Sequence, residues 1–292
     1  GRGWLTTSVD VPDNVAVHLG DFSRGSDRQF YSFEGFLTPA TLNLLDMRVG
    51  TTGRSETIAS APARFDASTH VVEQFEATSS DGTKIPYFVT RPRDLVMDGH
   101  APTIMYGYGG FQVSKPPAYI PEMGKLWLEE GGVYVNANIR GGGEFGPDWH
   151  QAVLNENRQL ATQHPELINA AVIESPLIDM LRYHELPAGA SWIGEYGDPR
   201  IPEEAAWIAG YSAYQQLRPD TDYPRVYITT NTLDDRVHAG HARKFAARLG
   251  DQGHDHLYYE ETSGGHSNDA DPVANARRWA RHYVYLAQQL MD

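Results

Sequence analysis

Two polar clusters near the C-terminal end of the chain contain side chains that can transfer protons. Residues 231–237, Asn-Thr-Leu-Asp-Asp-Arg-Val, follow the apolar run 226–230. Residues 262–267, Thr-Ser-Gly-Gly-His-Ser, follow the run 256–260. If both runs are parallel strands, the two clusters leave the sheet at the same edge.

The chemistry expected of these clusters is general acid–base catalysis by Asp234 and His266. A carboxylate next to an imidazole fixes its tautomer and stabilises the protonated ring, as in a catalytic triad. An Asp after one strand and a Gly-Gly-His after the next is also the order of the last two triad members in α/β hydrolases. The alternative is that Asp234 caps a helix beginning near Ala239 while His266 lies in a solvated loop. The occurrence of both residues at successive strand ends favours catalysis.

Two glycine-rich turns follow apolar runs earlier in the chain. The run 103–106 leads into Gly-Tyr-Gly-Gly-Phe at 107–111, and the run 132–139 leads into Arg140 and three glycines. Apolar runs of this length bounded by glycine are typical of central strands in a covered parallel sheet. Open α/β sheets place their ligands at such turns, although two strand-to-helix loops without chemistry would have the same pattern.

Strands and helices are expected to alternate from about residue 67 onward. The segments 71–77 and 84–90 flank an Asp-Gly turn and predict a hairpin. Ala242, Phe245, Ala246 and Leu249 recur at the spacing of an amphipathic helix. Further strands are expected at 103–106, 132–139, 168–174, 226–230 and 256–260, and further helices at 122–130, 147–158 and 273–290. This alternation predicts a doubly wound α/β domain over residues 67–292.

Residues 1–66 have a different pattern. Short β-prone segments separated by Gly, Ser, Asp and Pro predict a small antiparallel sheet. The segments are 15–19, 28–33, 42–46 and 56–58. Because so few strands cannot close a sandwich or a barrel, this part is expected to be the end of a larger β-structure.

The composition narrows the classes of partner. Hydrophobic residues make up 40% of the 292 residues, enough for the core of one large domain, with or without an appendage. The formal net charge of −14 argues against nucleic acid and leaves no polybasic patch for a membrane. No run approaches transmembrane length, and no signal peptide is expected. The absence of cysteine excludes a cysteine nucleophile but assigns no compartment; we expect the cytoplasm, with the periplasm or secretion as alternatives.

Several separate motifs, in the same order, resemble the peptidase domain of the prolyl oligopeptidase family. They are Tyr-Gly-Tyr-Gly-Gly-Phe at 106–111, Asn-Ile-Arg-Gly-Gly-Gly-Glu-Phe-Gly at 138–146, Trp149-His150, Ser-Trp-Ile-Gly-Glu-Tyr-Gly at 191–197, Asp-Asp-Arg-Val at 234–237 and Gly-Gly-His at 264–266. The resemblance covers about residues 70–292 and implies an α/β-hydrolase fold. It also makes residues 1–66 similar to the last part of that family's β-propeller, most of which is not in this sequence.

Position by position, the resemblance implies roles for eight residues. Asp234 and His266 would be the acid and the base of a Ser-His-Asp triad, and the Tyr108 phenol would donate a hydrogen bond to the oxyanion. The remaining residues would bind substrate: Phe111, Trp192, Tyr196 and Val237 would line a pocket for a proline ring, and Arg236 would donate to a substrate carbonyl. Flat aromatic walls suit a rigid apolar ring. Ordinary core packing is the alternative for the four pocket residues.

The serine nucleophile that this chemistry requires has no counterpart in the sequence. A nucleophile elbow has the pattern Gly-x-Ser-x-Gly, and no serine here has glycine both two residues before and two residues after it. Ser55 and Ser267 each have only the preceding glycine, and neither lies between the oxyanion turn and Asp234. The family pattern runs through 155–159 and resumes at 160–167, so the elbow, its strand and the flanking helices are missing at that junction.

Three hypotheses account for the gap. The protein contains segments that this sequence omits; or the polypeptide is a natural or engineered deletion that binds proline-containing peptides without cleaving them; or only the scaffold is kept, in a structural or interaction protein. Loss of a central strand would leave unpaired backbone groups on two neighbouring strands. We therefore favour the first hypothesis.

The expected function is that of a serine peptidase that hydrolyses short peptides on the C-terminal side of proline. The alternatives are a related serine peptidase or esterase of other specificity, and the inactive peptide-binding scaffold. The expected chemistry needs no cofactor and no metal. His254, Asp255 and His256 are not expected to form a metal site, because they lack a further ligand at suitable spacing. The expected partners are short proline-containing peptides, with no nucleic acid and no membrane, and the protein is expected to be a monomer.

Overall fold

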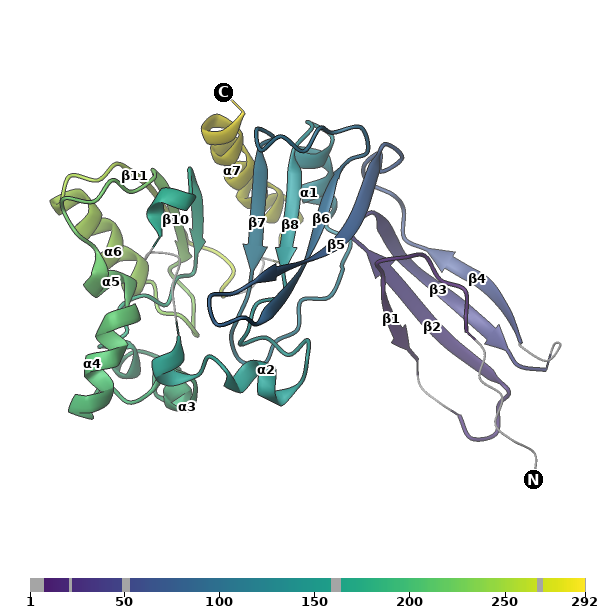
Figure 1. The fold of residues 1–292 in the computed structure, drawn as a ribbon, viewed down its shortest axis with the longest axis horizontal. Coiled ribbons are helices and arrows are strands. Elements are labelled where there is room, and N and C mark those ends of the chain that lie inside the picture. Colours follow the sequence, from purple (N-terminus) through teal and green to yellow (C-terminus); the bar gives the residue numbers. More distant parts are fainter. Residues whose placement is uncertain (1–7, 21–22, 49–52, 159–163, 267–269, 292) are drawn as a thin grey trace. The chain divides into compact units, whose positions relative to one another are not determined.

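The computed structural model describes residues 8–20, 23–48, 53–158, 164–266 and 270–291. The chain divides into two units (Figure 1). Unit 1 consists of residues 1–108 and 114–139, and unit 2 consists of residues 109–113 and 140–292. Unit 1 contains two sheets and unit 2 contains one, and each unit has apolar residues buried in its interior. The predicted domain boundary at 66/67 falls inside unit 1 and stays a prediction.

The N-terminal sheet of unit 1 is antiparallel, and its strands follow one another in chain order. Tyr31 and Phe36 are buried, whereas the last strand is exposed along its whole length. The four strands are β1 (Ala16–Leu19), β2 (Arg28–Gly35), β3 (Thr38–Asp46) and β4 (Arg54–Ser60). The small antiparallel sheet predicted for this part is confirmed.

The second sheet of unit 1 has the strand order β5-β6-β8-β7. Gly82, in the turn of the predicted hairpin, has a φ of +85°, which glycine adopts without strain. Strand β8 pairs antiparallel with β6 and parallel with β7. The strands are β5 (His70–Thr78), β6 (Lys84–Pro92), β7 (Thr103–Gly107) and β8 (Val133–Ala137). The hairpin and both predicted strands are therefore confirmed.

A short helical segment connects β7 to β8. It consists of α1 (Pro121–Met123) and the π-helical turn η1 (Gly124–Leu128). Trp127 is fully buried, and its indole N–H donates to the Val133 carbonyl at 2.8 Å. This bond joins the segment to Val133, the first residue of β8. All five residues of β8 are buried.

Among the described strands, β7 pairs with β8 alone and forms the edge of its sheet. Met105 is 72% exposed and Tyr106 is 39% exposed. Apolar strands of this kind are typical of sheet interiors. β7 therefore combines the sequence of a central strand with the exposure of an edge strand.

The sheet of unit 2 is parallel, in the order β11-β10-β9. Helix α6 (Gly240–Asp251) follows the central strand, and its Phe245 and Leu249 are buried against Ile228. Each such side chain contributes about 1.5–3 kcal/mol to stability through burial. The strands are β9 (Ala171–Glu174), β10 (Val226–Asn231) and β11 (His256–Glu261). The last helix is α7 (Pro272–Leu290). Asp271 precedes it as the N-cap, and its side chain accepts from the Val273 N–H at 2.9 Å.

Short helices between β9 and β10 form a second core in unit 2 around Met180, Tyr183, Ile208 and Tyr211. They are η5 (Tyr183–Glu185), η6 (Gly189–Trp192), α3 (Ile193–Tyr196), α4 (Pro202–Tyr211) and α5 (Ala213–Gln216). The sequence predictions did not include these helices. The predicted helix at 147–158 is only partly formed, as α2 (Pro147–Gln151) and η2 (Asn155–Asn157), and the turn η4 (Pro165–Leu167) precedes β9.

Across the described ranges, no helix combines the length and the apolar character needed to cross a lipid bilayer.

Candidate active site

Asp234 and His266 are hydrogen-bonded to each other at the carboxyl ends of two paired strands. The parallel register pairs Asn231 with Glu261 at the ends of β10 and β11, so the loops that follow leave the sheet together. The Nδ1 atom of His266 lies 2.8 Å from Oδ2 and 3.0 Å from Oδ1 of Asp234. The Asp234 side chain is completely buried, whereas the His266 side chain is 30% exposed. The Nδ1 edge of the imidazole is therefore held by the carboxylate, while part of the ring remains accessible to solvent.

Backbone hydrogen bonds orient the Asp234 carboxylate. Its Oδ1 accepts from the N–H groups of Arg236 at 3.0 Å and Val237 at 2.8 Å. The helix that follows begins at Gly240 with no side-chain cap, so Asp234 does not cap it. An ionised carboxylate only accepts hydrogen bonds, so Nδ1 of His266 carries the proton and Nε2 is left as the proton acceptor.

Asn231 connects the two loops that hold this pair. Its Oδ1 accepts from the Leu233 N–H at 2.8 Å, and its amide donates to the Ser263 carbonyl. The Thr232 N–H donates to the Glu261 carbonyl at 2.8 Å and extends the ladder by one residue. Asn231 is 7% exposed, so these bonds are shielded from water. The sequence predictions gave this residue no role.

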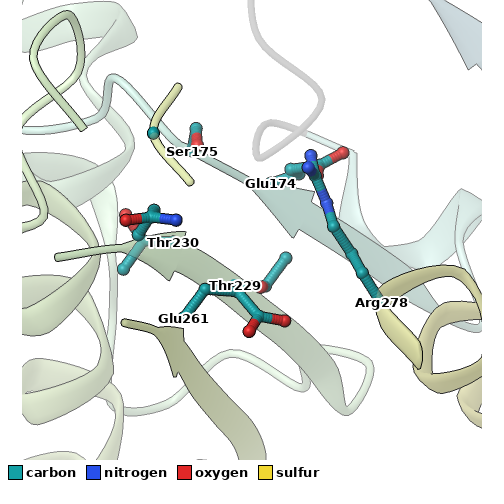
Figure 2. A pocket seen from close by; sticks show the side chains of 8 residues that line it. Glu174, Ser175, Thr229, Thr230, Glu261 and Arg278 are labelled. Carbon is teal, nitrogen blue, oxygen red and sulfur yellow. The ribbon is translucent and has the colours of Figure 1, made fainter. Parts of the chain in front are cut away.

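A small polar hollow opens at the carboxyl ends of the three strands of unit 2 (Figure 2). Arg278 extends from α7 to pair with Glu174 at the end of β9, as Figure 2 shows. The Thr230 hydroxyl is buried and has no hydrogen-bond partner among the described residues. The lining residues are Glu174, Ser175, Thr229, Thr230, Asn231, Glu261, Gly265 and Arg278. The hollow thus adjoins the loops of Asp234 and His266, at the sheet edge where α/β folds bind ligands.

Three of the predicted pocket residues come together as an aromatic group. The centre of the Phe111 ring lies 5.9 Å from the centre of the Trp192 ring and 5.6 Å from that of Tyr196, and the rings meet edge-on. Trp192 and Tyr196 pack against the second core of unit 2, but Phe111 is 38% exposed. The group is therefore partly open and is not a closed core.

The other three predicted residues have separate surroundings. Arg236 is exposed and Val237 is half-buried, both in the turn that follows Asp234. Tyr108 belongs to unit 1, where it is 36% exposed and the Lys115 ammonium lies 4.8 Å from the centre of its ring. Ser267 and the junction at 159/160 lie outside the described residues.

Buried Glu195 forms a polar cluster with the partly buried His150 and Arg158 beside the aromatic group. Each lies within a stretch that resembles the family, yet the sequence predictions gave none of them a role. An acidic residue flanked by aromatic residues was the only local signal. In the described part of the chain, no group of three His, Cys, Asp or Glu side chains is arranged to hold a metal ion.

Comparison with known proteins identifies the family. Residues 157–292 match the Prolyl oligopeptidase family (Peptidase_S9). The chain is 42% identical to an uncharacterized peptidase of Sinorhizobium fredii over 328 residues, covering 99% of this chain and 45% of the relative. That alignment exceeds the 292 residues of this chain by 36, so the relative has residues within the matched region that this chain lacks. A prolyl endopeptidase of Elizabethkingia meningoseptica is 33% identical, over 85% of this chain and 40% of that protein.

The fold has the same relatives. A post-proline cleaving enzyme from Rickettsia typhi superimposes with a TM-score of 0.88 at 32% identity, over 97% of this chain and 46% of that one. The chain thus spans less than half the length of each of these relatives. The predicted fold class, an α/β hydrolase with part of a β-propeller, is confirmed. By sequence and by fold, this chain belongs to the prolyl oligopeptidase family.

Proposed function

We propose that the protein is a serine peptidase that hydrolyses short peptides on the C-terminal side of proline. The observation that carries the proposal is the Asp234–His266 pair at the ends of β10 and β11, with its carboxylate buried and its imidazole open to solvent. Acyl transfer to a serine needs a base in this arrangement. The names of the Elizabethkingia and Rickettsia relatives support the preference for proline.

In this mechanism, Nε2 of His266 takes the proton from the serine hydroxyl as the oxygen attacks the scissile carbonyl. The imidazolium, stabilised by Asp234, then gives that proton to the leaving amine. Water repeats the two steps on the acyl-enzyme and releases the new C-terminus. The Tyr108 phenol donates to the oxyanion, which in comparable sites lowers the barrier by about 3–4 kcal/mol.

The aromatic group supplies the proposed pocket for the proline ring. The rings of Trp192 and Tyr196 lie edge-on to Phe111, and flat apolar walls of this kind suit a rigid ring. Val237 adds an aliphatic contact, and Arg236 donates to a substrate carbonyl as a fixed charged donor. The proposed ligands are therefore short proline-containing peptides, bound by a monomer.

The serine is proposed to lie in a segment that the 292-residue sequence omits. The alignment with the Sinorhizobium relative is 36 residues longer than this chain. A strand and its elbow need a length of this order. Apolar β7, at the edge of its sheet among the described strands, has the composition of a strand with a further neighbour.

A second candidate is an inactive scaffold that binds proline-containing peptides. The observation that favours it is the absence of any Gly-x-Ser-x-Gly pattern from the sequence. In that case the aromatic group would bind peptides and His266 would have no nucleophile to activate.

Hydrolysis of chromogenic peptides by the natural protein tests the proposal. Blocked dipeptide anilides ending in proline, arginine or alanine separate the proline peptidase from a related peptidase of other specificity. We expect kcat/KM for the proline substrate to exceed the other two by roughly 100-fold or more. Binding of the proline peptide without hydrolysis would instead identify the scaffold, and preference for arginine or alanine would contradict the proposal.

A further inference from the structure

A buried carboxylate holds the backbone that carries Phe111. Glu195, in α3, is 7% exposed. Its Oε1 accepts from the Phe111 N–H at 2.9 Å and from the Arg158 guanidinium at 2.7 Å. Its Oε2 lies 2.7 Å from Nε2 of His150. One side chain thus joins three segments that are far apart in sequence, and all of them belong to unit 2.

Arg158 extends this cluster to the other end of the same loop. While one of its terminal nitrogens binds Glu195, the other donates to the Gly109 carbonyl at 3.1 Å. Its guanidinium also lies 4.5 Å from the centre of the Tyr196 ring. A guanidinium can make these contacts at once because it is a planar fork of donors, which an ammonium is not. Glu195 and Arg158 therefore clamp the loop 109–111 from both sides.

The clamped loop has an unfavourable backbone conformation. Phe111 and Gln112 both have a φ of +54°, in the left-handed region that side chains other than glycine rarely adopt. Such a conformation persists where surrounding contacts enforce it. The Phe111 N–H is held by Glu195 and the Gln112 N–H by the Gly141 carbonyl at 3.2 Å. These contacts turn the Phe111 ring toward Trp192 and Tyr196.

We propose that Glu195, with Arg158 and His150, is a positioning group that sets the Phe111 ring against the aromatic group and thereby tunes its affinity for proline. The inference rests on the proposed function for the identity of the ligand, but not for the placement of Phe111. Glu195 acts through the Phe111 backbone and is not a catalytic residue. Burial of a charged cluster by itself adds little net stability, so its benefit is expected in geometry.

Fluorine NMR can measure the placement of Phe111 independently of any ligand. Phe111 is replaced by 4-fluorophenylalanine in the full chain, and the ¹⁹F signal reports the ring currents of Trp192 and Tyr196. Glu195→Gln keeps the shape of the side chain but removes its charge and one acceptor. We expect the signal to shift and broaden in Glu195→Gln as the loop populates other conformations.

The Arg158 variants separate geometry from charge. Arg158→Lys keeps the positive charge but can contact Glu195 or the Gly109 carbonyl, not both. We expect it to change the ¹⁹F signal almost as much as Arg158→Met does. If Arg158→Lys leaves the signal unchanged, charge neutralisation is the only role of Arg158, and the clamp is refuted.

Glu129 supplies the matched control. It lies in unit 1 and also accepts from a backbone N–H, that of Asp66 at 2.8 Å, and from the Lys125 ammonium. Glu129→Gln should leave the ¹⁹F signal as it is in the unsubstituted chain. Thermal unfolding of each variant distinguishes a displaced loop from a chain that fails to fold; if Glu195→Gln unfolds, Arg158→Lys carries the test.

Binding of a blocked Gly-Pro amide completes the experiment, because it needs no serine nucleophile. We expect the Kd to rise roughly tenfold in Glu195→Gln, the loss that one charge-assisted hydrogen bond represents. A blocked Gly-Ala amide should bind weakly to every variant. If the unsubstituted chain does not bind the proline peptide, the proposed function fails while the ¹⁹F result still decides the positioning role. An unchanged ¹⁹F signal and an unchanged Kd in Glu195→Gln would overturn the inference.

Discussion

At the scale of single residues, the proposed chemistry depends on the orientation of the His266 imidazole. The Asp234 side chain is completely buried, accepts from two backbone N–H groups and binds Nδ1 of His266. These contacts fix the tautomer before a substrate arrives. In the proposed mechanism, Nε2 of His266 is then the site of proton transfer.

Asp234→Asn should abolish most of the peptidase activity without unfolding the protein. An amide oxygen can still accept from Arg236 and Val237, but the amide nitrogen facing Nδ1 favours the wrong tautomer. The same change in a well-characterised Ser-His-Asp triad lowers kcat by about 10⁴-fold, and we expect a loss of about 10³–10⁴-fold in kcat/KM here. The measurement is hydrolysis of a Gly-Pro anilide by the natural protein and its variant.

Its neighbour Asp235, which is exposed, is the control. Asp235→Asn makes the same change in charge and should leave kcat/KM within about twofold, since surface substitutions have small effects. Equal losses in both variants would mean that Asp234 acts through net charge and not through His266.

At the scale of elements, two glycine-rich turns meet in the loops that support the aromatic group. Gly141 has a φ of +96°, and a Cβ atom there would lie 2.2 Å from the Gly109 carbonyl oxygen. The turn therefore brings two stretches of backbone closer than any side chain permits.

Gly141→Ala should lower the free energy of unfolding by about 2–4 kcal/mol, since backbone strain and overpacking act together. Gly82 provides the comparison, because it has a φ of +85° but open space where a Cβ would lie. Gly82→Ala should cost only about 1–2 kcal/mol. Urea denaturation measures both, and equal costs would show that the contact with Gly109 is unimportant.

The elements with a local pattern could be predicted from the sequence. The helical spacing of Ala242, Phe245, Ala246 and Leu249 predicts α6, and all four side chains are buried. The Asp-Gly turn likewise predicts the β5–β6 hairpin. In these cases the pattern that predicts the element lies within a short stretch of sequence.

Contacts between distant segments could not be predicted. Glu195 and Phe111 are 84 residues apart, and nothing in either stretch indicates that a carboxylate accepts from that backbone N–H. The sequence of β7 correctly indicates a strand, but Met105 and Tyr106 are exposed because β7 pairs with β8 alone among the described strands. Composition reports the environment for which a strand is suited, and that environment depends on segments elsewhere in the chain.

At the scale of the whole molecule, two buried histidines couple stability to pH. Burial lowers the pKa of His241 and that of His282 to about 4 each; Lys244 adds to the effect at His241, and Arg278 and Arg281 add to it at His282. The pKa of histidine in an unfolded chain is about 6.5. Below pH 6.5 the unfolded chain therefore binds protons that the folded chain excludes, and stability falls as the pH drops toward 4.

His282→Phe should flatten this pH dependence. The His282 ring lies edge-on to Tyr227 and Trp279 at 5.6 and 5.5 Å, so phenylalanine keeps both ring contacts. The loss of unfolding free energy between pH 7 and pH 5 should shrink by about 1–2 kcal/mol. Urea denaturation at both pH values measures it. Val284→Ala, at a position 56% exposed on the same helix, should leave the slope unchanged.

Labelling of the natural protein with a fluorophosphonate tests most directly whether Asp234 and His266 serve a serine. The labelled residue is located by proteolysis and mass spectrometry. We expect one labelled serine, in a Gly-x-Ser-x-Gly peptide that enters the sequence near residue 159 and is absent from the 292 residues, and we expect Asp234→Asn to slow its labelling. A folded protein that binds proline peptides but takes up no label, or takes it up on a serine already in this sequence, would contradict the proposed catalytic triad.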